Sequence, residues 1–420
     1  MATAVPLLRA LGVASRRVAT LVDARDTSYA RFRAWAAARD PAAPLALIHA
    51  PSAGEWRQAE PVVAALRSFH PGLLFAFTYT SPSAVTVAAE LAPAVHGYLP
   101  WDRPRDVGAM LDVLRPSILV ITKLDVWPEL ARQARARGLP IVLIAATVRE
   151  RSTRLHGPGR LIVRSAYEAV ELALAVGPED AVRLAALGVA PDRISVVGDP
   201  RYDGVLERLE GLTDRPVPDL LVAGSTWPAD ERILLEAFRD VREEHRSARL
   251  LLVPHRPGTS DAGRIARLAR RVGLPGPEVI TAVESLTPEG VTADLMLVPR
   301  VGGLARWYGL GTLAYVGGGF GRGLHSVLEP AAWGRPMFAG PRWRESAEAT
   351  ALERARALTP IEGRRPAEQL AHHWAWLLGN PDARYRAGLA AKVHVEDQAG
   401  AARIIAGFVL EAMQTEKGRD

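Results

Sequence analysis

The stretch LAYVGGGFGRGLHSVLEPAAWGRP, residues 313–336, contains the pattern that decides the fold class. Its first four residues form a short apolar run typical of a buried strand, and glycines follow at 317, 318, 319, 321 and 323. Glycine lets the backbone take positive φ and approach a ligand closely. We therefore expect a strand, a glycine-rich turn and the start of a helix, whose free N–H groups would suit a phosphate.

Two features favour a ligand at this turn over a plain glycine-rich loop. His325 and Glu329 lie in the expected first turns of the helix, and a second Gly-Pro turn, Gly340-Pro341, follows closely. An acid in that position can hold ribose hydroxyls. We interpret the stretch as a nucleotide or sugar-phosphate site, with a ligand-free αβ loop as the alternative.

The same alternation of strand and helix runs through the rest of the chain. In the first half we expect strands at 45–49, 73–79, 97–100, 118–122, 141–145, 171–176 and 194–197. In the second half we expect them at 220–223, 250–253, 279–281, 295–298, 313–316 and 336–339. Such alternation predicts α/β architecture with doubly wound parallel sheets. Two Rossmann-like halves imply a cleft, with ligands at the carboxyl ends of the strands.

The domain boundary is predicted from a change in composition. Residues 209–218 combine glycine, proline and mixed charge, which is typical of a linker, so we expect domains at 1–208 and 209–420. The second domain would end in helices over about 367–413. Residues 1–40 are basic and helical in pattern, with Leu7, Leu8 and Leu11 among the apolar positions. They fit a packed amphipathic helix or a helix on an anionic membrane surface.

Composition excludes several classes of protein. The 420 residues contain no cysteine, which rules out disulfides, zinc–thiolate sites and cysteine nucleophiles. The net charge of +6 suits an anionic ligand or a membrane surface, but it is too diffuse to indicate nucleic acid. No apolar run approaches 18 residues, and no P-loop, HExxH or GxSxG motif is present. We therefore predict no transmembrane helix, no metal site and no bound cofactor.

The first half offers an acid and several cations at strand ends. Ser52, Gly54 and Glu55 follow the strand at 45–49. A carboxylate at a helix N-terminus is stabilised as the anion and can act as a general base, although acids are common there for structural reasons alone. Lys123 and Asp125 follow the strand at 118–122, on the cleft side, and can also pair with each other.

The second half offers groups suited to a phosphate. Ser225 and Thr226 precede a helix, where their hydroxyls can contact a phosphate or cap the helix. His255 and Arg256 follow the next strand, and arginine binds phosphate with two parallel hydrogen bonds, so this pair is either a phosphate contact or a surface turn. Arg201, near the expected hinge, is a further cationic candidate.

Several motifs together resemble one family. The segment HAPSAGEWRQAEP (49–61) resembles the HxxSxGE motif of the Kdo transferases, which move 3-deoxy-D-manno-octulosonic acid from CMP-Kdo to a lipid A precursor. Further matches in the same order are TYTSPS (78–83), YLPWD (98–102), VVGDPRYD (196–203), VAGSTW (222–227), LLVPHRP (251–257) and GGGFGRGLHSVLEPAAWGRPMFAGP (317–341). The resemblance covers about 45–400.

The resemblance implies a GT-B fold and a metal-independent, inverting glycosyl transfer. The first domain would bind the acceptor and the second the nucleotide sugar, with Glu55 as general base. The expected donor contacts are Ser225, Thr226, His255, Arg256, Gly318, Gly319, His325, Ser326 and Glu329. The glycine N–H groups and Arg256 would stabilise the departing phosphate. The implied location is cytoplasmic and peripheral, on the inner face of the cell membrane.

The chain departs from the family pattern around these motifs. Lys123-Leu124-Asp125 stands where the family has Glu-Thr-Glu, His255-Arg256 reverses an Arg-His pair, and Trp227 replaces a histidine. Ser326 replaces an asparagine and Arg201 a lysine. Three functions therefore stay open: a Kdo transferase, a GT-B transferase with another donor or acceptor, and a binding protein that has lost catalysis. Retention of Glu55 argues against the last.

Overall fold

The computed structural model describes residues 16–256, 261–283, 293–300 and 302–415. Leu7, Leu8 and Leu11 of the expected N-terminal segment lie outside these ranges.

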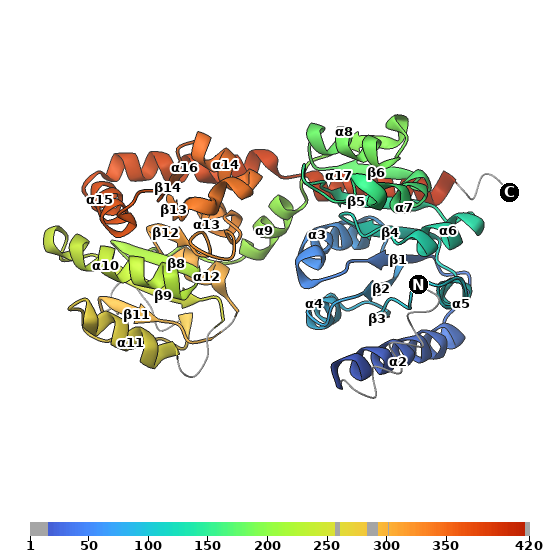
Figure 1. The fold of residues 1–420 in the computed structure, drawn as a ribbon, viewed down its shortest axis with the longest axis horizontal. Coiled ribbons are helices and arrows are strands. Elements are labelled where there is room, and N and C mark those ends of the chain that lie inside the picture. Colours follow the sequence, from blue (N-terminus) through green and yellow to red (C-terminus); the bar gives the residue numbers. More distant parts are fainter. Residues whose placement is uncertain (1–15, 257–260, 284–292, 301, 416–420) are drawn as a thin grey trace. The chain divides into compact units, whose positions relative to one another are not determined.

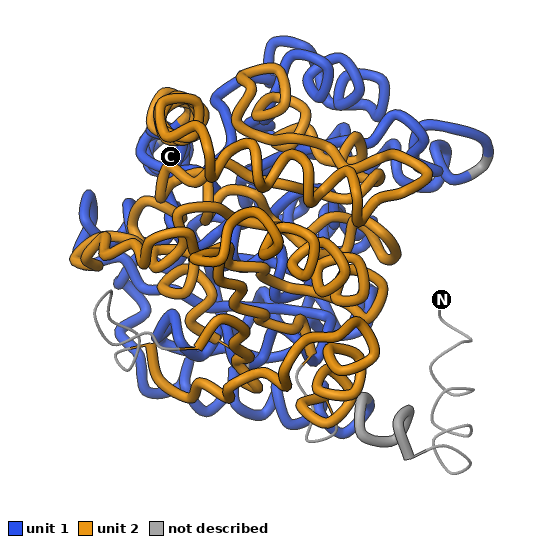
Figure 2. Tube along the Cα trace, turned by 90° about the vertical axis from the view of Figure 1, so that its left-hand side faces the viewer, with its two compact units in different colours: residues 1–204, 399–420 blue, residues 205–398 orange. Residues whose placement is uncertain are grey.

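The chain forms two compact units (Figure 2). Unit 1 comprises Met1–Gly204 together with Ala399–Asp420, and unit 2 comprises Val205–Gln398. The division falls close to the expected one at 208/209. It differs in returning residues 399–420 to the first unit, whereas the sequence pattern had assigned them to the second.

Unit 1 is built on a seven-stranded parallel sheet in the order β3-β2-β1-β4-β5-β6-β7 (Figure 1). Its strands are β1 (Leu45–His49), β2 (Leu74–Tyr79), β3 (Val95–Tyr98), β4 (Ile118–Thr122), β5 (Ile141–Ala146), β6 (Leu172–Ala175) and β7 (Ile194–Val196). Its helices are α2 (Arg16–Ala38), α3 (Ala53–Phe69), α4 (Ala84–Glu90), α5 (Pro104–Leu114), α6 (Pro128–Ala136), α7 (Gly157–Glu168), α8 (Pro178–Leu187), η1 (Pro191–Arg193) and α17 (Ala401–Thr415). α9 (Arg201–Leu209) crosses the boundary between the units.

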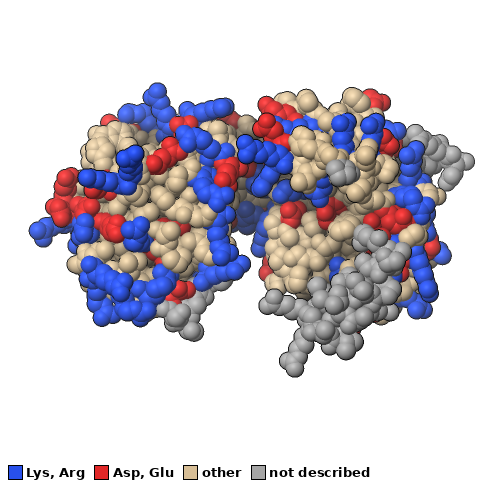
Figure 3. Space-filling view, viewed as in Figure 1, with Lys and Arg blue, Asp and Glu red and all other residues tan. Residues whose placement is uncertain are grey.

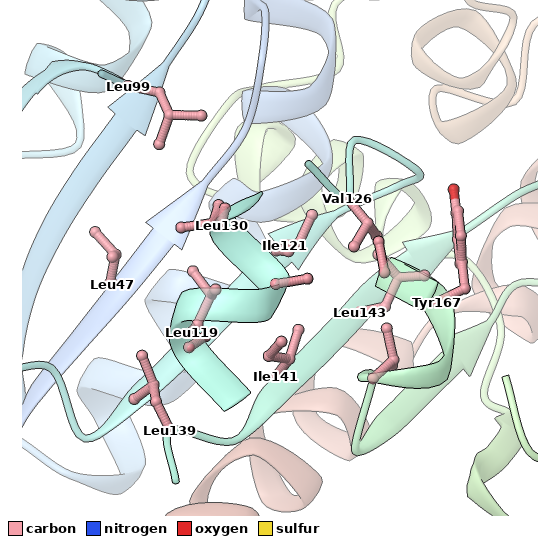
Figure 4. Packing of buried hydrophobic residues seen from close by; sticks show 14 of the residues in the cluster. Leu47, Leu99, Leu119, Ile121, Val126, Leu130, Leu139, Ile141, Leu143 and Tyr167 are labelled. Atoms are coloured by element: carbon pink, nitrogen blue, oxygen red, sulfur yellow. The ribbon is translucent and has the colours of Figure 1, made fainter. Parts of the chain in front are cut away.

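The central strand β1 shows why these residues form a buried sheet. All five of its residues are buried, and it pairs in parallel with β2 on one side and β4 on the other. A continuous apolar run is typical of a parallel strand that is covered on both faces. Leu45 and Leu47 join the core on one face, which Figure 4 shows in part, and Ala46 and Ile48 join the core on the other.

Helix α17 belongs to unit 1 because its apolar face completes that second core. Ile405 and Val409 are fully buried in the same cluster as Ile48, and the helix contacts α3. The carboxylate of Asp203 accepts hydrogen bonds from the N–H groups of Gly400 (2.8 Å) and Ala402 (3.2 Å), so it caps the start of the helix. The local sequence pattern of 401–415 predicts a helix but does not indicate which of the two cores that helix packs against.

Helix α2 covers the edge of the sheet at β3. The Ser28 hydroxyl accepts a hydrogen bond from the Tyr98 N–H (2.9 Å), and Phe32 is buried in the core beside it. The described part of this helix is therefore packed, as one of the two interpretations expected. Among the described residues, no helix has both the length and the apolar character needed to cross a membrane.

Unit 2 repeats the architecture with a second seven-stranded parallel sheet, in the order β10-β11-β9-β8-β12-β13-β14. Its strands are β8 (Leu220–Thr226), β9 (Arg249–Pro254), β10 (Glu278–Val279), β11 (Leu295–Leu297), β12 (Leu313–Val316), β13 (Met337–Ala339) and β14 (Leu358–Pro360). Its helices are α10 (Pro228–Glu244), α11 (Asp261–Arg271), α12 (Leu304–Leu310), α13 (Leu328–Ala332), η3 (Pro341–Glu345), α14 (Ala347–Arg354), α15 (Pro366–Gly379) and α16 (Pro381–Gln398). The expected class of two doubly wound parallel sheets is confirmed.

Each sheet has one point at which the strand order reverses. In unit 1 the reversal lies between β1 and β4, and in unit 2 between β8 and β12. The connections leave these neighbouring strands in opposite directions, so the loops after them part and expose the strand ends. The loops after β1, β4, β8 and β12 carry most of the residues that the sequence singled out.

Candidate functional site

The loop after β1 places Glu55 in the first turn of α3. Ser52, just before the helix, donates a hydrogen bond from its hydroxyl to one carboxylate oxygen of Glu55. The Nζ atom of Lys123 lies 3.3 Å from the other oxygen. The Glu55 side chain is 17 % exposed, and Gly54 beside it is exposed. Glu55 is thus a partly enclosed carboxylate with a proton donor on each oxygen.

The loop after β4 does not pair Lys123 with Asp125, which the sequence had left open. Lys123 reaches Glu55, and Asp125 instead contacts the buried His49, with 3.4 Å from Nε2 to Oδ2. Trp127 Nε1 donates to the same oxygen at 2.9 Å, and Arg154 lies 3.6 Å from Oδ1. Burial raises the pKa of Asp125, but these hydrogen bonds and positive charges together hold it below its usual value.

These loops border a cavity of about 420 Å³ within unit 1. It is lined by Pro51, Glu55, Thr122, Lys123, Leu124, Asp125, Thr147, Arg149, Arg151, Ser152 and Arg154. The cavity therefore combines a carboxylate that can accept a proton with a predominantly cationic wall.

The loop after β8 contains Ser225 and Thr226, which differ in backbone conformation and in burial. Ser225 has a φ of +53°, uncommon for a residue other than glycine, at an irregularity in the pairing of β8 with β9. Thr226 is buried, and its hydroxyl contacts Glu231 at 3.4 Å. The Thr226 hydroxyl is thus engaged inside unit 2 in this arrangement, and its contact with a phosphate stays a prediction.

The glycine-rich loop after β12 is fixed by a buried carboxylate. Asp230, in the first turn of α10, accepts hydrogen bonds from the N–H groups of Gly318 (3.0 Å) and Trp227 (2.9 Å). It also accepts one from the Tyr315 hydroxyl (2.8 Å). Burial raises the pKa of Asp230, while the hydrogen bonds it accepts partly oppose that rise. Asp230 therefore joins the ends of β8 and β12.

Three glycines of the turn have N–H groups that are already bonded, which limits how many remain for a phosphate. The N–H of Gly318 is taken by Asp230, and those of Gly321 and Gly323 donate to the Gly318 carbonyl. Helix α13 begins only at Leu328 and has five residues. The glycines instead permit close packing, because a Cβ added at Gly319 would lie 2.7 Å from the backbone of Gly340.

Beside this loop, aromatic rings and cations gather at the ends of β8, β9 and β12. The rings of His255 and His325 stack with centroids 4.2 Å apart, and Trp227 Nε1 donates to His325 Nε2 at 3.0 Å. Arg322 lies over the Trp227 ring at 4.8 Å and Arg256 at 6.0 Å. Burial, with a smaller effect from His255, lowers the pKa of His325 to about 4. His325 is therefore neutral near pH 7.

The remaining expected residues lie around this cluster or apart from it. Glu329 is in the first turn of α13, 3.9 Å from Arg208 Nε. Ser326 is exposed. Arg201 belongs to unit 1, where its guanidinium is engaged by Asp199 at 2.5 Å, so its charge is largely satisfied within that unit.

Sequence reasoning gave no role to Arg322 or to Asp230 as the anchor of the glycine loop. The signal for Asp230 is an acid three residues after Trp227, at the start of a helix, where it can accept the preceding N–H. Arg322 stands within the glycine run itself. Within the described ranges, no group of three or more histidine, aspartate or glutamate side chains is arranged to hold a metal ion.

Comparison with known proteins connects this geometry to one family. The profile of a family described as 3-deoxy-D-manno-octulosonic-acid transferase (kdotransferase) matches residues 27–204. The 3-deoxy-D-manno-octulosonic acid transferase of Bordetella pertussis is 29% identical over 407 residues, which cover 89% of each chain. The enzyme of that name from Haemophilus influenzae is 27% identical over 308 residues, 70% of each chain.

Solved structures show the same fold at much lower identity. UDP-GlcNAc 2-epimerase from Neisseria meningitidis has a TM-score of 0.60 at 12% identity, covering 88% of this chain and 100% of that one. MurG from Acinetobacter baumannii has a TM-score of 0.55 at 13% identity, covering 88% and 99%. These likenesses concern the fold alone.

Proposed function

Because the chain belongs to the Kdo transferase family of glycosyltransferases, we propose that it transfers Kdo from CMP-Kdo to a lipid A precursor, with inversion at the anomeric carbon. The observation that carries the proposal is the position of Glu55. A partly enclosed carboxylate at the switch point of the first sheet borders a cavity and has no role in the core.

Glu55 is the general base in this proposal. The acceptor hydroxyl oxygen attacks the anomeric carbon of Kdo and its proton passes to Glu55. The bond from that carbon to the phosphate oxygen breaks, and CMP departs with the electron pair. Ser52 and Lys123, which donate to the two Glu55 oxygens, orient the carboxylate before the acceptor arrives.

The donor half lies at the ends of β8, β9 and β12. Arg256 and Arg322 supply positive charge for the phosphate of CMP, and the stacked rings of Trp227, His255 and His325 offer flat surfaces beside it. Glu329, a partly exposed acid on α13, would accept hydrogen bonds from the ribose hydroxyls in this proposal. In this proposal the cations, rather than the N–H of Gly318, stabilise the leaving phosphate, because the Gly318 N–H is already bonded to Asp230.

A lipid acceptor requires the protein to meet a membrane, and α7 provides a suitable surface. Leu161 is 78 % exposed and Ile162 is 67 % exposed, and Arg160 and Arg164 flank them. Exposed apolar side chains beside cations fit the interface of an anionic bilayer. We place the peripheral membrane contact here, because the described part of α2 is packed against the sheet.

The test is a transfer assay with CMP-Kdo and a lipid A precursor, followed by mass spectrometry of the lipid. Addition of the mass of Kdo residues is expected. In parallel, CMP should raise the melting temperature and UDP should not. Stabilisation by UDP in place of CMP would indicate a GT-B transferase with another donor, and a failure of every nucleotide to bind would indicate a protein that has lost catalysis.

A further inference from the structure

We propose that the cavity of unit 1 binds an anionic group of the acceptor, and that Lys123 leaves Glu55 to contact that anion when the acceptor binds. The ligand class is a sugar bearing a phosphate or a carboxylate close to the hydroxyl that reacts. This inference rests on the proposed transferase function and goes further, by assigning the acceptor contacts to Lys123, Arg149 and Arg151.

The charge of the cavity wall is the first support. Four cations and two acids line it: Lys123, Arg149, Arg151 and Arg154 against Glu55 and Asp125. Lys123 pairs with Glu55 at 3.3 Å and Arg154 approaches Asp125 at 3.6 Å. Among the described residues, no ion pair joins Arg149 or Arg151 to an acid. Pairing within the wall thus leaves two arginines uncompensated.

Convergence on one cavity distinguishes these cations from others on the surface, although Arg149 and Arg151 are themselves exposed. Basic side chains are spread over the visible face of both units, so one exposed arginine indicates nothing (Figure 3). Here the cations converge on a cavity of about 420 Å³ that also contains the proposed base. Arginine forks match the geometry of phosphate and carboxylate oxygens, and a positively charged wall would disfavour a cationic ligand.

Lys123 occupies a constrained position in this wall. Its φ of +68° lies in the left-handed region, and its N–H donates to the Ile144 carbonyl at 2.8 Å, which holds the backbone of the loop. The side chain is 37 % exposed, so its ammonium can move while the backbone stays fixed. The ammonium sits where glutamate stands in the family pattern, which reverses the charge next to the base.

The pairing has a chemical consequence for Glu55. Lys123 occupies one oxygen of this carboxylate and Ser52 donates to the other, so neither oxygen is open to an acceptor hydroxyl. An anion entering the cavity attracts Lys123, and the released Glu55 oxygen can then accept the proton of the neighbouring hydroxyl. Binding of the correct acceptor would in this way release the base, and a neutral sugar would leave the ion pair in place.

The test measures binding to the full-length protein by calorimetry, with three probes: N-acetylglucosamine 1-phosphate, glucuronic acid and uncharged N-acetylglucosamine. We expect at least tenfold tighter binding of one or both anionic probes than of the neutral one. Comparison of the phosphate probe with the carboxylate probe shows which of these two anionic groups the cavity prefers. Equal binding of all three, or of none, would overturn the inference.

Substitutions of the cavity-lining cations test whether these side chains bind the anionic probes. Lys123→Met and Arg151→Met should each reduce the affinity for the anionic probe about tenfold, and Lys123→Arg should retain most of it. Arg132→Met is the matched control, because Arg132 is an exposed arginine of unit 1 that pairs with Glu129 on α6, away from the cavity lining. If Arg132→Met reduces binding as much as Arg151→Met, the cavity is not the site. Circular dichroism checks that each variant is folded.

A second experiment tests the anion site separately from the proposed transferase function. Transfer from CMP-Kdo to intact and to dephosphorylated lipid A precursor is compared. Equal KM values for the two lipids, together with no selectivity for a carboxylate, would overturn the anion site and leave the transferase function standing. Absence of transfer to either lipid would overturn the function, while the binding of the three probes would still test the anion site.

Discussion

Unit 1 and unit 2 present candidate residues at the same topological position but with different chemistry. In unit 1 the loops at the strand reversal place Glu55 against Lys123 and Asp125 against Arg154 around a cavity. In unit 2 the loops carry stacked rings and arginines, and the buried Asp230 fixes their backbone. Under the proposed function, the same fold position would serve proton transfer in unit 1 and nucleotide binding in unit 2.

The largest expected effect removes the base from unit 1. Glu55→Gln keeps the shape and the contact with Ser52 but cannot accept a proton, so transfer should fall by about 10²- to 10⁴-fold. Binding of CMP, measured by calorimetry, should stay within about twofold, because the proposed nucleotide contacts all belong to unit 2. The paired variant Glu329→Gln should instead weaken CMP binding, because Glu329 is the proposed partner of the ribose hydroxyls. If both variants changed CMP affinity equally, the assignment of separate roles would fail.

A smaller effect is expected from removing the anchor of the glycine loop. Asp230→Ala leaves the N–H groups of Gly318 and Trp227 and the Tyr315 hydroxyl without their acceptor, at a cost of about 2–4 kcal/mol to the folding of unit 2. CMP binding should be lost or severely weakened. Denaturant unfolding and calorimetry measure the two effects.

The matched control for Asp230 lies in unit 1. Asp102 also accepts two backbone hydrogen bonds, from Glu129 (3.1 Å) and Leu130 (3.0 Å) at the start of α6. Asp102→Ala should destabilise unit 1 and leave CMP binding unchanged. Loss of CMP binding in that variant would show that the two units are not independent in the way the comparison requires.

The stability of unit 2 should also depend on pH through His325. The pKa of this histidine is lowered from 6.5 to about 4 in the folded protein, so the unfolded chain binds the proton more readily between those values. Stability is therefore full above pH 6.5 and falls as pH decreases toward 4, by about 1–2 kcal/mol for a partly exposed ring. His325→Gln should flatten this part of the profile in chemical unfolding.

His255 contributes a shift of the same sign, because burial and the charges of Arg256 and Arg322 lower its pKa. The comparison of wild type with His325→Gln isolates the His325 part. An unchanged pH profile would contradict the assignment of a neutral, buried His325. Saturating CMP should raise the pKa of His325, measured by NMR, if the phosphate lies beside the ring.

The smallest effect concerns the cap of α17. Asp203→Ala removes the acceptor of the Gly400 and Ala402 N–H groups and should cost about 1 kcal/mol. Hydrogen exchange should quicken in 401–415 and stay unchanged in unit 2. Faster exchange spread evenly over both units would contradict the assignment of this helix to unit 1.

Much of the fold could be predicted from local patterns. Apolar runs bounded by glycine and proline placed the strands at 118–122 and 313–316 where the structure has them. The three-residue β14 was missed because LTP is too short to show a period. The place of α17 was missed because an apolar helix face does not reveal which of two cores it completes.

The candidate site was predictable in position but not in its contacts. Motifs and strand ends located Glu55 and His325, since carboxyl ends of parallel strands share one edge. The pair Glu55–Lys123 joins residues 68 positions apart, and the Asp230–Gly318 contact joins residues 88 positions apart. Such partners are set by tertiary structure. For this reason the glycine N–H groups were expected to be free, whereas the Gly318 N–H is bonded to Asp230.

Because α17 belongs to unit 1 although it follows unit 2 in the sequence, the two units complete their cores in a defined order during synthesis. All of unit 2, residues 205–398, is one continuous segment, and it emerges from the ribosome before 399–415 can complete the first core. Unit 2 can therefore fold during synthesis while one face of the earlier sheet still lacks Ile405 and Val409. That apolar face is the surface on which a nascent-chain chaperone would have the longest opportunity to act.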